Sequence, residues 1–182
     1  MRELSLHILD IVQNSIAAGA RTVDVAISED EAADLLTIEV ADDGAGIPRD
    51  ILESVLDPFY TSRTTRKVGL GLPLFREAAR AAGGDLSIES VPGRGTTVRA
   101  TFRMSHIDRA PLGDMAETLA LLVVCNPDVR FRYMHWRGHA AFSLDSDEFR
   151  RGLGDDIAPT NPALAGVLRD VIREGLAPVQ RA

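Results

Sequence analysis

A carboxylate followed by two glycines ends an apolar run in the first third of the chain. The run covers residues 35–41, which is typical of a strand entering the core, and the sequence continues as Asp42-Asp43-Gly44-Ala45-Gly46-Ile47-Pro48. The glycines give the backbone conformational freedom and let a ligand approach it closely. A carboxylate at the base of a pocket can accept a hydrogen bond from the exocyclic amine of a purine. The alternative is an ordinary surface turn formed by an aspartate.

A second set of polar residues lies on a predicted N-terminal helix over residues 3–18, which Gly19 ends as a left-handed cap. At 100° per residue, His7, Asp10 and Asn14 share one stripe of this helix. Apolar residues cover much of the remaining circumference, so we expect the helix to be largely buried. A polar stripe on a buried helix needs partners, and a ligand is one candidate. A solvated helix face is the other interpretation.

Three further segments follow at intervals. They are Asp57-Pro58-Phe59-Tyr60-Thr61-Ser62-Arg63, Gly69-Leu70-Gly71-Leu72 and Gly93-Arg94-Gly95-Thr96. The glycine pair in the second of them stands at the start of a predicted helix, where backbone N–H groups and the helix dipole favour phosphate. Taken in order, the five segments resemble the N, G1, F, G2 and G3 boxes of the GHKL ATPases. That superfamily includes gyrase, the ninety-kilodalton heat-shock chaperones, histidine kinases and the MutL mismatch-repair ATPases.

The resemblance covers roughly the first hundred residues and implies a Mg-ATP site. It implies that Asp42 accepts from adenine and that Gly44, Gly46 and Ile47 shape the pocket. Asn14 resembles the residue that binds Mg²⁺, a cation that prefers oxygen ligands. Asp10 stands one turn earlier, where the GHKL hydrolases carry a longer glutamate that activates water.

The remaining ATP-binding residues implied by the resemblance belong to a short lid and to the two later turns. They are Phe59, Thr61, Arg63, Arg66, Lys67, Gly69, Leu70, Gly71, Leu72 and Thr96. Phe59 resembles the aromatic anchor of the lid, and the basic residues can neutralise phosphate charge. For any single basic residue of this loop, a solvated charge is the alternative.

Periodicity predicts the elements that must position these residues. Strands are expected over 22–28, 35–41, 85–91 and 96–103, and helices over 3–18, 48–55 and 70–82. This pattern predicts an α+β fold with three helices on one face of a mixed, mostly antiparallel four-stranded sheet. It matches the two-layer α/β sandwich, or Bergerat fold, that the resemblance implies.

The composition changes after Met104, and residues 108–113 are typical of a linker. We therefore divide the chain into an ATP-binding domain over 1–104 and a C-terminal extension over 105–182. The extension is predicted as a helix over 115–124, a hairpin over 129–136 and 139–144, and helices over 145–153 and 161–176. We recognise no family in it. We expect a partner-binding module that contributes little to nucleotide affinity, or else a cover for an exposed sheet face.

Several histidines and basic residues invite a chemical interpretation. His7 could contact the nucleotide or accept a phosphoryl group, but a partly buried histidine bonded to a neighbour is the favoured interpretation. His135 and His139 flank the hairpin turn, without a cysteine or a second pair to support a metal site. Arg130, Arg132 and Tyr133 are interpreted as an exposed strand face.

The composition limits the classes of protein and partner. The 182 residues are 45% hydrophobic and 26% charged with a net charge of -7, so the backbone of a nucleic acid is not an expected partner. The single cysteine, Cys125, excludes an intrachain disulfide and suits a reducing cytoplasm. The chain shows no apolar stretch of membrane-spanning length and no secretory signal. We expect a cytoplasmic protein without membrane contact.

The Asp57-Pro58-Phe59 and Gly69-Leu70-Gly71-Leu72 pair looks most like histidine kinases. The N box begins almost at Met1, so the helical hairpin that carries the phosphorylated histidine is not expected. We therefore predict an Mg-ATP-binding, histidine-kinase-like protein in signal transduction, a kinase that acts in trans on a protein partner. The alternatives are an ATP-hydrolysing conformational switch and a non-catalytic ATP sensor, and a homodimer stays open.

Overall fold

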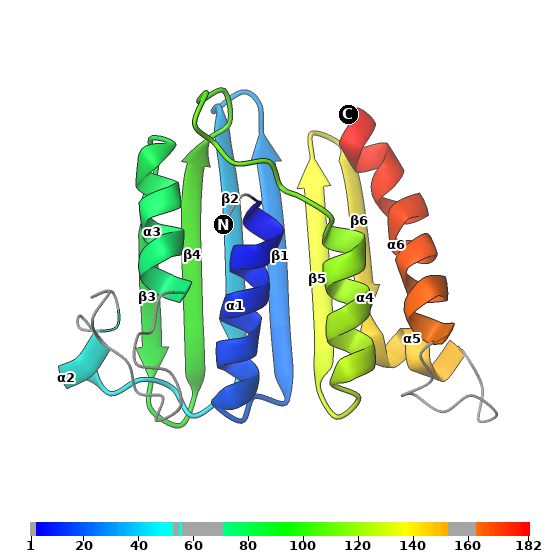
Figure 1. Cartoon of the computed structure of the whole chain (residues 1–182), viewed down its shortest axis with the longest axis horizontal. Helices are drawn as coiled ribbons and strands as arrows, with labels where there is room; N and C mark the ends of the chain where they lie inside the picture. The colour runs from blue at the N-terminus through cyan, green and yellow to red at the C-terminus, as the bar shows by residue number, and fades with distance from the viewer. Residues whose placement is uncertain (1–2, 53–54, 56–70, 153–162) are drawn as a thin grey trace.

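The computed structural model describes residues 3–52, 55, 71–152 and 163–182 as two layers, helices on one face of a sheet (Figure 1). The helices are α1 (Leu4–Ala17), α2 (Arg49–Leu52), α3 (Gly71–Ala81), α4 (Met115–Cys125), α5 (Ser146–Gly152) and α6 (Ala163–Arg181). The strands are β1 (Thr22–Asp30), β2 (Leu35–Asp42), β3 (Leu86–Val91), β4 (Gly95–Arg103), β5 (Arg130–Arg137) and β6 (Ala140–Asp145). Among the helices of these ranges, none has the length and apolar character needed to cross a bilayer.

One continuous sheet runs through both halves of the chain, in the order β3-β4-β2-β1-β5-β6. The four strands expected in the N-terminal half pair antiparallel with one another, and β5 joins the edge of β1 in parallel. The α+β two-layer fold is thus confirmed, but the sheet has six strands instead of the expected four, because the hairpin expected in the extension adds β5 and β6 to it. Without β5, the edge of β1 would leave backbone groups unpaired. Helix α4 lies in the connection that leads from β4 to β5, and a parallel strand needs such a long connection.

Strand alternation divides the sheet into a helix-covered face and an open face. In β1, Val23, Val25 and Ile27 are buried while the residues between them are partly exposed. Successive side chains of a strand point to opposite faces, so the buried set lies under the helices. The same rule places Tyr133 of β5, only 2% exposed, on the covered face. Our expectation of an exposed Tyr133 was wrong, because it alternates with Arg130 and Arg132.

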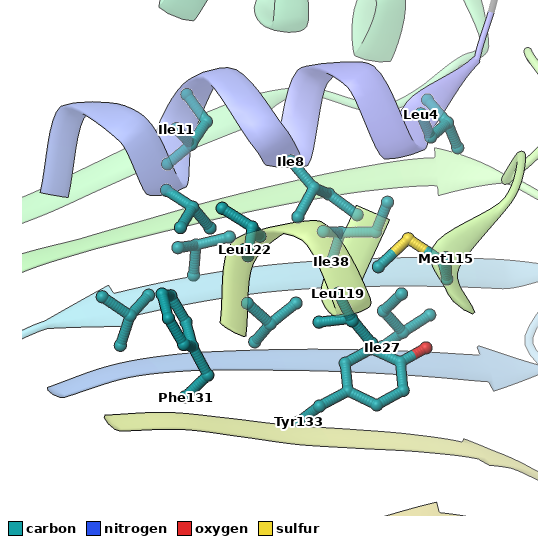
Figure 2. Packing of buried hydrophobic residues seen from close by; sticks show 14 of the residues in the cluster. Leu4, Ile8, Ile11, Ile27, Ile38, Met115, Leu119, Leu122, Phe131 and Tyr133 are labelled. Atoms are coloured by element: carbon teal, nitrogen blue, oxygen red, sulfur yellow. The ribbon is translucent and has the colours of Figure 1, made fainter. Parts of the chain in front are cut away.

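The two halves of the chain share one hydrophobic core (Figure 2). Side chains from α1 and α4 face those of β1, β2 and β5 across the layers. The ten labelled members are Leu4, Ile8, Ile11, Ile27, Ile38, Met115, Leu119, Leu122, Phe131 and Tyr133. Helix α4 is thus packed into the same core as α1, and the C-terminal extension contributes to the interior of the ATP-binding half.

The linker between β4 and α4 holds the start of α1. The backbone N–H of Leu4 donates to Pro111 O at 2.9 Å, and that of Ser5 donates to Leu112 O at 2.8 Å. These bonds satisfy N–H groups that have no partner within the helix. Gly113 has a φ of +84°, and a Cβ there would lie 2.4 Å from the Ser5 hydroxyl, so only glycine fits. The first turn of α1 therefore depends on the chain that leads into the extension.

Candidate functional site

The carboxylate of Asp42 lies at the end of β2 and is held from two sides. The Ser15 hydroxyl of α1 donates to Asp42 Oδ2 at 2.7 Å, and the backbone N–H of Gly44 donates to Oδ1 at 2.9 Å. An ionised carboxylate has about four acceptor positions, so two such bonds leave capacity for a further donor. The geometry fixes the direction of the carboxylate and keeps acceptor capacity available.

The turn after Asp42 passes so close to its neighbours that two of its positions leave little or no room for a side chain. A Cβ on Gly44 would lie 3.0 Å from Asp42 Oδ1 and 3.1 Å from the Ala18 carbonyl oxygen. Gly46 has a φ of +69°, and a Cβ there would lie 2.3 Å from Val91 O. Ala45 N also donates to Ala18 O at 2.9 Å. The turn is therefore fixed between the end of α1 and the turn that follows β3.

Ile47 and Thr96 meet through a serine that links the two turns. Ile47 N donates to Ser90 Oγ at 2.7 Å, and Ser90 Oγ lies 2.9 Å from Thr96 Oγ1. Thr96 is also the register partner of Asp42 between β2 and β4. Directly opposed residues of paired strands share a face of the sheet. The structure thus places Thr96 beside Asp42, with Ile47 held by the same network.

Asp10 and Asn14 lie together at the start of α3. A Cβ on Gly71, the first residue of α3, would lie 3.5 Å from Asp10 Cβ and 3.8 Å from Asn14 Nδ2. Asp10 and Asn14 are half-buried, as is Leu72 one residue further along α3. The polar stripe of α1 therefore faces a helix N-terminus, where N–H groups without intrahelical partners favour an anion.

The other predicted members of the site lie outside the described residues. They are Phe59, Thr61, Arg63, Arg66, Lys67, Gly69 and Leu70.

Sequence reasoning missed two residues, Ser15 and Ser90. Ser15 did carry a signal, because it falls on the stripe of α1 that also holds Leu4, Ile8 and Ile11. A buried hydroxyl on an apolar stripe requires a partner, and Ser15 is 3% exposed. Ser90 carried no such signal, since its contacts depend on how β3 meets the turn that follows Asp42.

His7 is buried in the contact between α1 and α3. It is 2% exposed, and its ring stacks on Phe75 with centroids 5.0 Å apart and an interplanar angle of 18°. Burial lowers the pKa of His7 from 6.5 to about 4. We expected a hydrogen bond to a neighbour, but within the described residues His7 Nδ1 has none. Packing against Phe75 holds the ring in place of a hydrogen bond.

The lowered pKa of His7 predicts a loss of stability in acid. The unfolded chain takes up the proton near pH 6.5 and the folded chain only near pH 4, so the free energy of unfolding falls as the pH drops through this window. The full loss is about 3 kcal/mol. Urea unfolding at pH 7, 5.5 and 4.5, compared with His7→Phe, measures it. A His7→Phe variant whose stability falls as steeply as that of the natural chain would contradict the prediction.

The two histidines that flank the hairpin turn have different surroundings. His135 is buried, with Nε2 2.7 Å from Glu29 Oε1 and Nδ1 3.1 Å from the Tyr133 hydroxyl. The hydrogen bond with His135 lowers the pKa of Glu29. His139 is exposed. In the described ranges no group of three or more His, Cys, Asp or Glu residues is suited to a metal. The contact between His135 and Glu29 joins β5 to β1.

The fold, the two glycine turns and the helix stripe together define a GHKL-type ATPase domain. Residues 2–106 match the family described as histidine kinase-, DNA gyrase B-, and HSP90-like ATPases, and the chain belongs to this family. The motif resemblance of the sequence is thereby confirmed.

Several curated relatives of this chain are sensor kinases. Sensor histidine kinase WalK of Bacillus subtilis (strain 168) is 38% identical over 106 residues, which covers 53% of this chain and 17% of that protein. Sensor kinase CckA of Brucella abortus (strain 2308) is 40% identical over 148 residues, which covers 69% of this chain and 16% of that protein. The chain therefore spans less than a fifth of the length of either kinase.

A solved structure supports the fold alone. The N terminal domain of a DNA repair protein superposes with a TM-score of 0.56 at 16% identity, covering 80% of this chain and 52% of that one. At this identity the likeness concerns the arrangement of helices and strands.

Proposed function

We propose that the chain binds Mg-ATP between α1, the turn after β2 and the start of α3. The observation that carries the proposal is the Asp42 carboxylate, oriented by Ser15 and Gly44 N with acceptor capacity left over. The half-buried Asp10 and Asn14 beside the N-terminus of α3 add a place where a triphosphate and its cation fit.

Each residue of this site has a proposed task. Asp42 accepts from the adenine amine, and Gly44, Gly46, Ile47 and Thr96 form the walls around the base. Asn14 offers its amide oxygen to Mg²⁺, and Gly71 and Leu72 begin the helix that meets the phosphates. For Phe59, Thr61, Arg63, Lys67, Gly69 and Leu70, the assignment rests on the motif resemblance.

Asp10 is the proposed general base. The candidate reactions differ in the group from which it accepts a proton. A carboxylate one turn before Asn14 can accept a proton from an attacking water or from a protein nucleophile. Because the named relatives are kinases, we propose phosphoryl transfer in trans to a protein partner as the main activity. An ATP-hydrolysing switch and an ATP sensor remain the competing functions.

Purified chain incubated with γ-labelled ATP, alone and with candidate partner proteins, tests the activity. A kinase transfers label to one partner and needs Asp10, whereas a switch releases labelled phosphate at a rate that the partner changes. A sensor binds ATP and does neither. We expect no acid-labile label on the chain itself, because none of its four histidines lies in a phosphoacceptor helix that resembles a known one. Label on His7 would contradict this expectation.

Asn14→Ala is expected to weaken Mg-ATP binding far more than binding of ATP in EDTA. The physical reason is that the amide oxygen is proposed to bind Mg²⁺ and not the nucleotide. Its removal should therefore lower the affinity for ATP only when the metal is present. Calorimetric titration with MgCl₂ and with EDTA measures the two affinities. Gln13→Ala, an exposed neighbour on the same helix, is the matched control. Equal losses for Asn14→Ala under both conditions would assign Asn14 to the structure of the helix.

A further inference from the structure

Strand β6 (Ala140–Asp145) is the last strand of the sheet, and among the described residues its outer edge has no partner strand. On the inner side it pairs with β5, and within the same ranges residues 140–144 make no other backbone hydrogen bond. In an edge strand, N–H and C=O groups point away from the sheet at every second residue. Residues 140–144 also carry no charge and no proline, the features that usually protect such an edge. The edge of β6 can therefore pair with one more strand.

On its helix-covered side, β6 brings two large apolar side chains to this edge. Phe142 and Leu144 are the register partners of His135 and Tyr133, which are buried under the helices, so they share that face. Both are only half-buried. Helix α6 runs along and beyond β6 in the helix layer (Figure 1), and a Cβ on Gly175 would overlap the ring of Phe142. Helix α6 therefore touches β6 from the covered side and lies out of the plane in which a further strand would pair.

The flank of α6 that faces away from α4 is apolar. Arg169 forms an ion pair with Glu117 of α4 at 3.1 Å, so the flank of α6 that carries Arg169 faces α4. At 100° per residue, Val167 lies on the other side of the buried Leu168 from Arg169, and Val171 follows Val167 one turn later. Val167 and Val171 are 51% and 43% exposed. These two valines form the outer flank of α6, on the side that lies beyond β6.

We propose that the edge of β6 binds an extended segment of a protein partner, which adds a further strand to the sheet. The backbone of that segment pairs with the outward N–H and C=O groups of β6. Because the side chains of a strand alternate between its two faces, every second side chain of the segment turns toward the helix layer. There it covers Phe142, Leu144 and the outer flank of α6, so apolar residues are expected at these positions. The residues between them face the open side of the sheet and are polar.

A helix of the partner and a second copy of the chain both fit this edge less well. A helix uses its backbone groups internally, so it would leave those of β6 unpaired. A second copy that paired through its own β6 would bring its own α6. Paired strands lie about 4.8 Å apart, whereas the axes of packed helices need about 8–10 Å. Because α6 extends beyond β6 (Figure 1), two such helices related by a twofold axis would overlap. An extended segment without a helix avoids this overlap.

The probe is a fluorescein-labelled peptide of about six residues, the usual length of a strand, with valine at alternate positions and threonine or lysine between. We expect saturable binding to the full chain by fluorescence anisotropy. Hydrogen exchange should locate the peptide, because the outward amides of residues 140–144 become protected when it binds. The measurement needs no nucleotide, so its failure says nothing about the ATP site. A peptide that does not saturate, or that protects other strands and not β6, would overturn the proposal.

Methylation of the peptide backbone distinguishes strand addition from non-specific apolar adhesion. Only every second N–H of a paired strand points toward its neighbour. Two further peptides therefore carry N-methyl groups on one alternate set of residues or on the other, with the same side chains. We expect one of them to bind about tenfold more weakly or worse, through the loss of its hydrogen bonds, and the other to bind like the parent peptide. Equal affinities of the two methylated peptides would contradict pairing with β6.

Variants of the full chain test the contribution of α6. Val171→Ser should weaken binding of the parent peptide about fivefold, and the double variant Val167→Ser/Val171→Ser should weaken it further. Leu121→Ser, at a 46% exposed position of α4, is the matched control and should bind normally. Thermal unfolding by circular dichroism checks that each variant is folded. Unchanged affinity in the double variant would overturn the proposal. A chain that sediments as a dimer, and as a monomer in the double variant, would assign this edge to a second copy instead.

Discussion

Asp42→Asn is expected to abolish measurable ATP binding while the chain keeps its fold. The substitution removes the charge of the proposed adenine acceptor and turns an NH₂ group toward either Ser15, Gly44 N or the base. All three groups donate to the carboxylate in the proposed complex. Toward Gly44 N or the base the NH₂ group meets another donor, and toward Ser15 it forces the hydroxyl to accept and to turn its proton to Ile11 O at 3.3 Å. The loss of a charge-assisted bond and an unsatisfied buried donor should cost about 2–3 kcal/mol or more. That is a loss of roughly 30- to 150-fold in affinity.

Calorimetric titration with Mg-ATP measures this effect, and two further variants define it. Ser15→Ala removes only the bond that orients Asp42 Oδ2, so its affinity should lie between those of Asp42→Asn and the natural chain. Glu39→Gln neutralises a carboxylate of the same strand on the open face and should leave affinity unchanged. Near-natural affinity in Asp42→Asn would remove this residue from the proposed site.

A chain that ends at Ser105 is expected to lose its stable fold. It would lack the linker carbonyls that hold the first turn of α1, the strand that covers the edge of β1, and the apolar face of α4. Burial of one large apolar side chain contributes about 1.5–3 kcal/mol. Five or more such side chains come from beyond Ser105, including Met115, Leu119 and Phe131. Five of them contribute about 7.5–15 kcal/mol, which is as large as the total stability of about 5–15 kcal/mol that domains possess.

Circular dichroism, thermal unfolding and dye binding on the shortened chain measure the loss. Two leucine-to-alanine substitutions in α4 of the full chain, one buried and one exposed, show how much a single side chain of this helix contributes to stability. Leu119→Ala, at a fully buried position, should lower the free energy of unfolding by about 2–5 kcal/mol. Leu121→Ala, at a position 46% exposed, should change it by about 0.5 kcal/mol. A shortened chain that unfolds as cooperatively as the full one and binds ATP normally would show a separable module. That separable module is what the sequence alone led us to expect.

The sequence by itself determined the class of the protein and much of the first hundred residues. The class follows from motifs whose order and spacing are local properties of the chain, and the family match over residues 2–106 confirms it. Strands β1 and β2 were recognisable because the alternation of apolar and polar residues is a local property of each strand's own sequence. The requirement for Gly44 and Gly46 was likewise visible, since an abrupt turn after a buried strand restricts the residue type locally.

Only the tertiary structure decided which segments meet. Alternation within a strand shows which residues share a face, but it does not show which strand is the neighbour. Thr22 and Arg130, for example, are register partners although more than a hundred residues separate them in the sequence. The same holds for the pairing of Ser15 with Asp42 and for the side of β5 on which Tyr133 lies. The extension looked separable because its apolar periodicity is its own. It joins the common core for two reasons. Strand β5 pairs with the backbone groups at the edge of β1, and the apolar face of α4 is buried against the sheet.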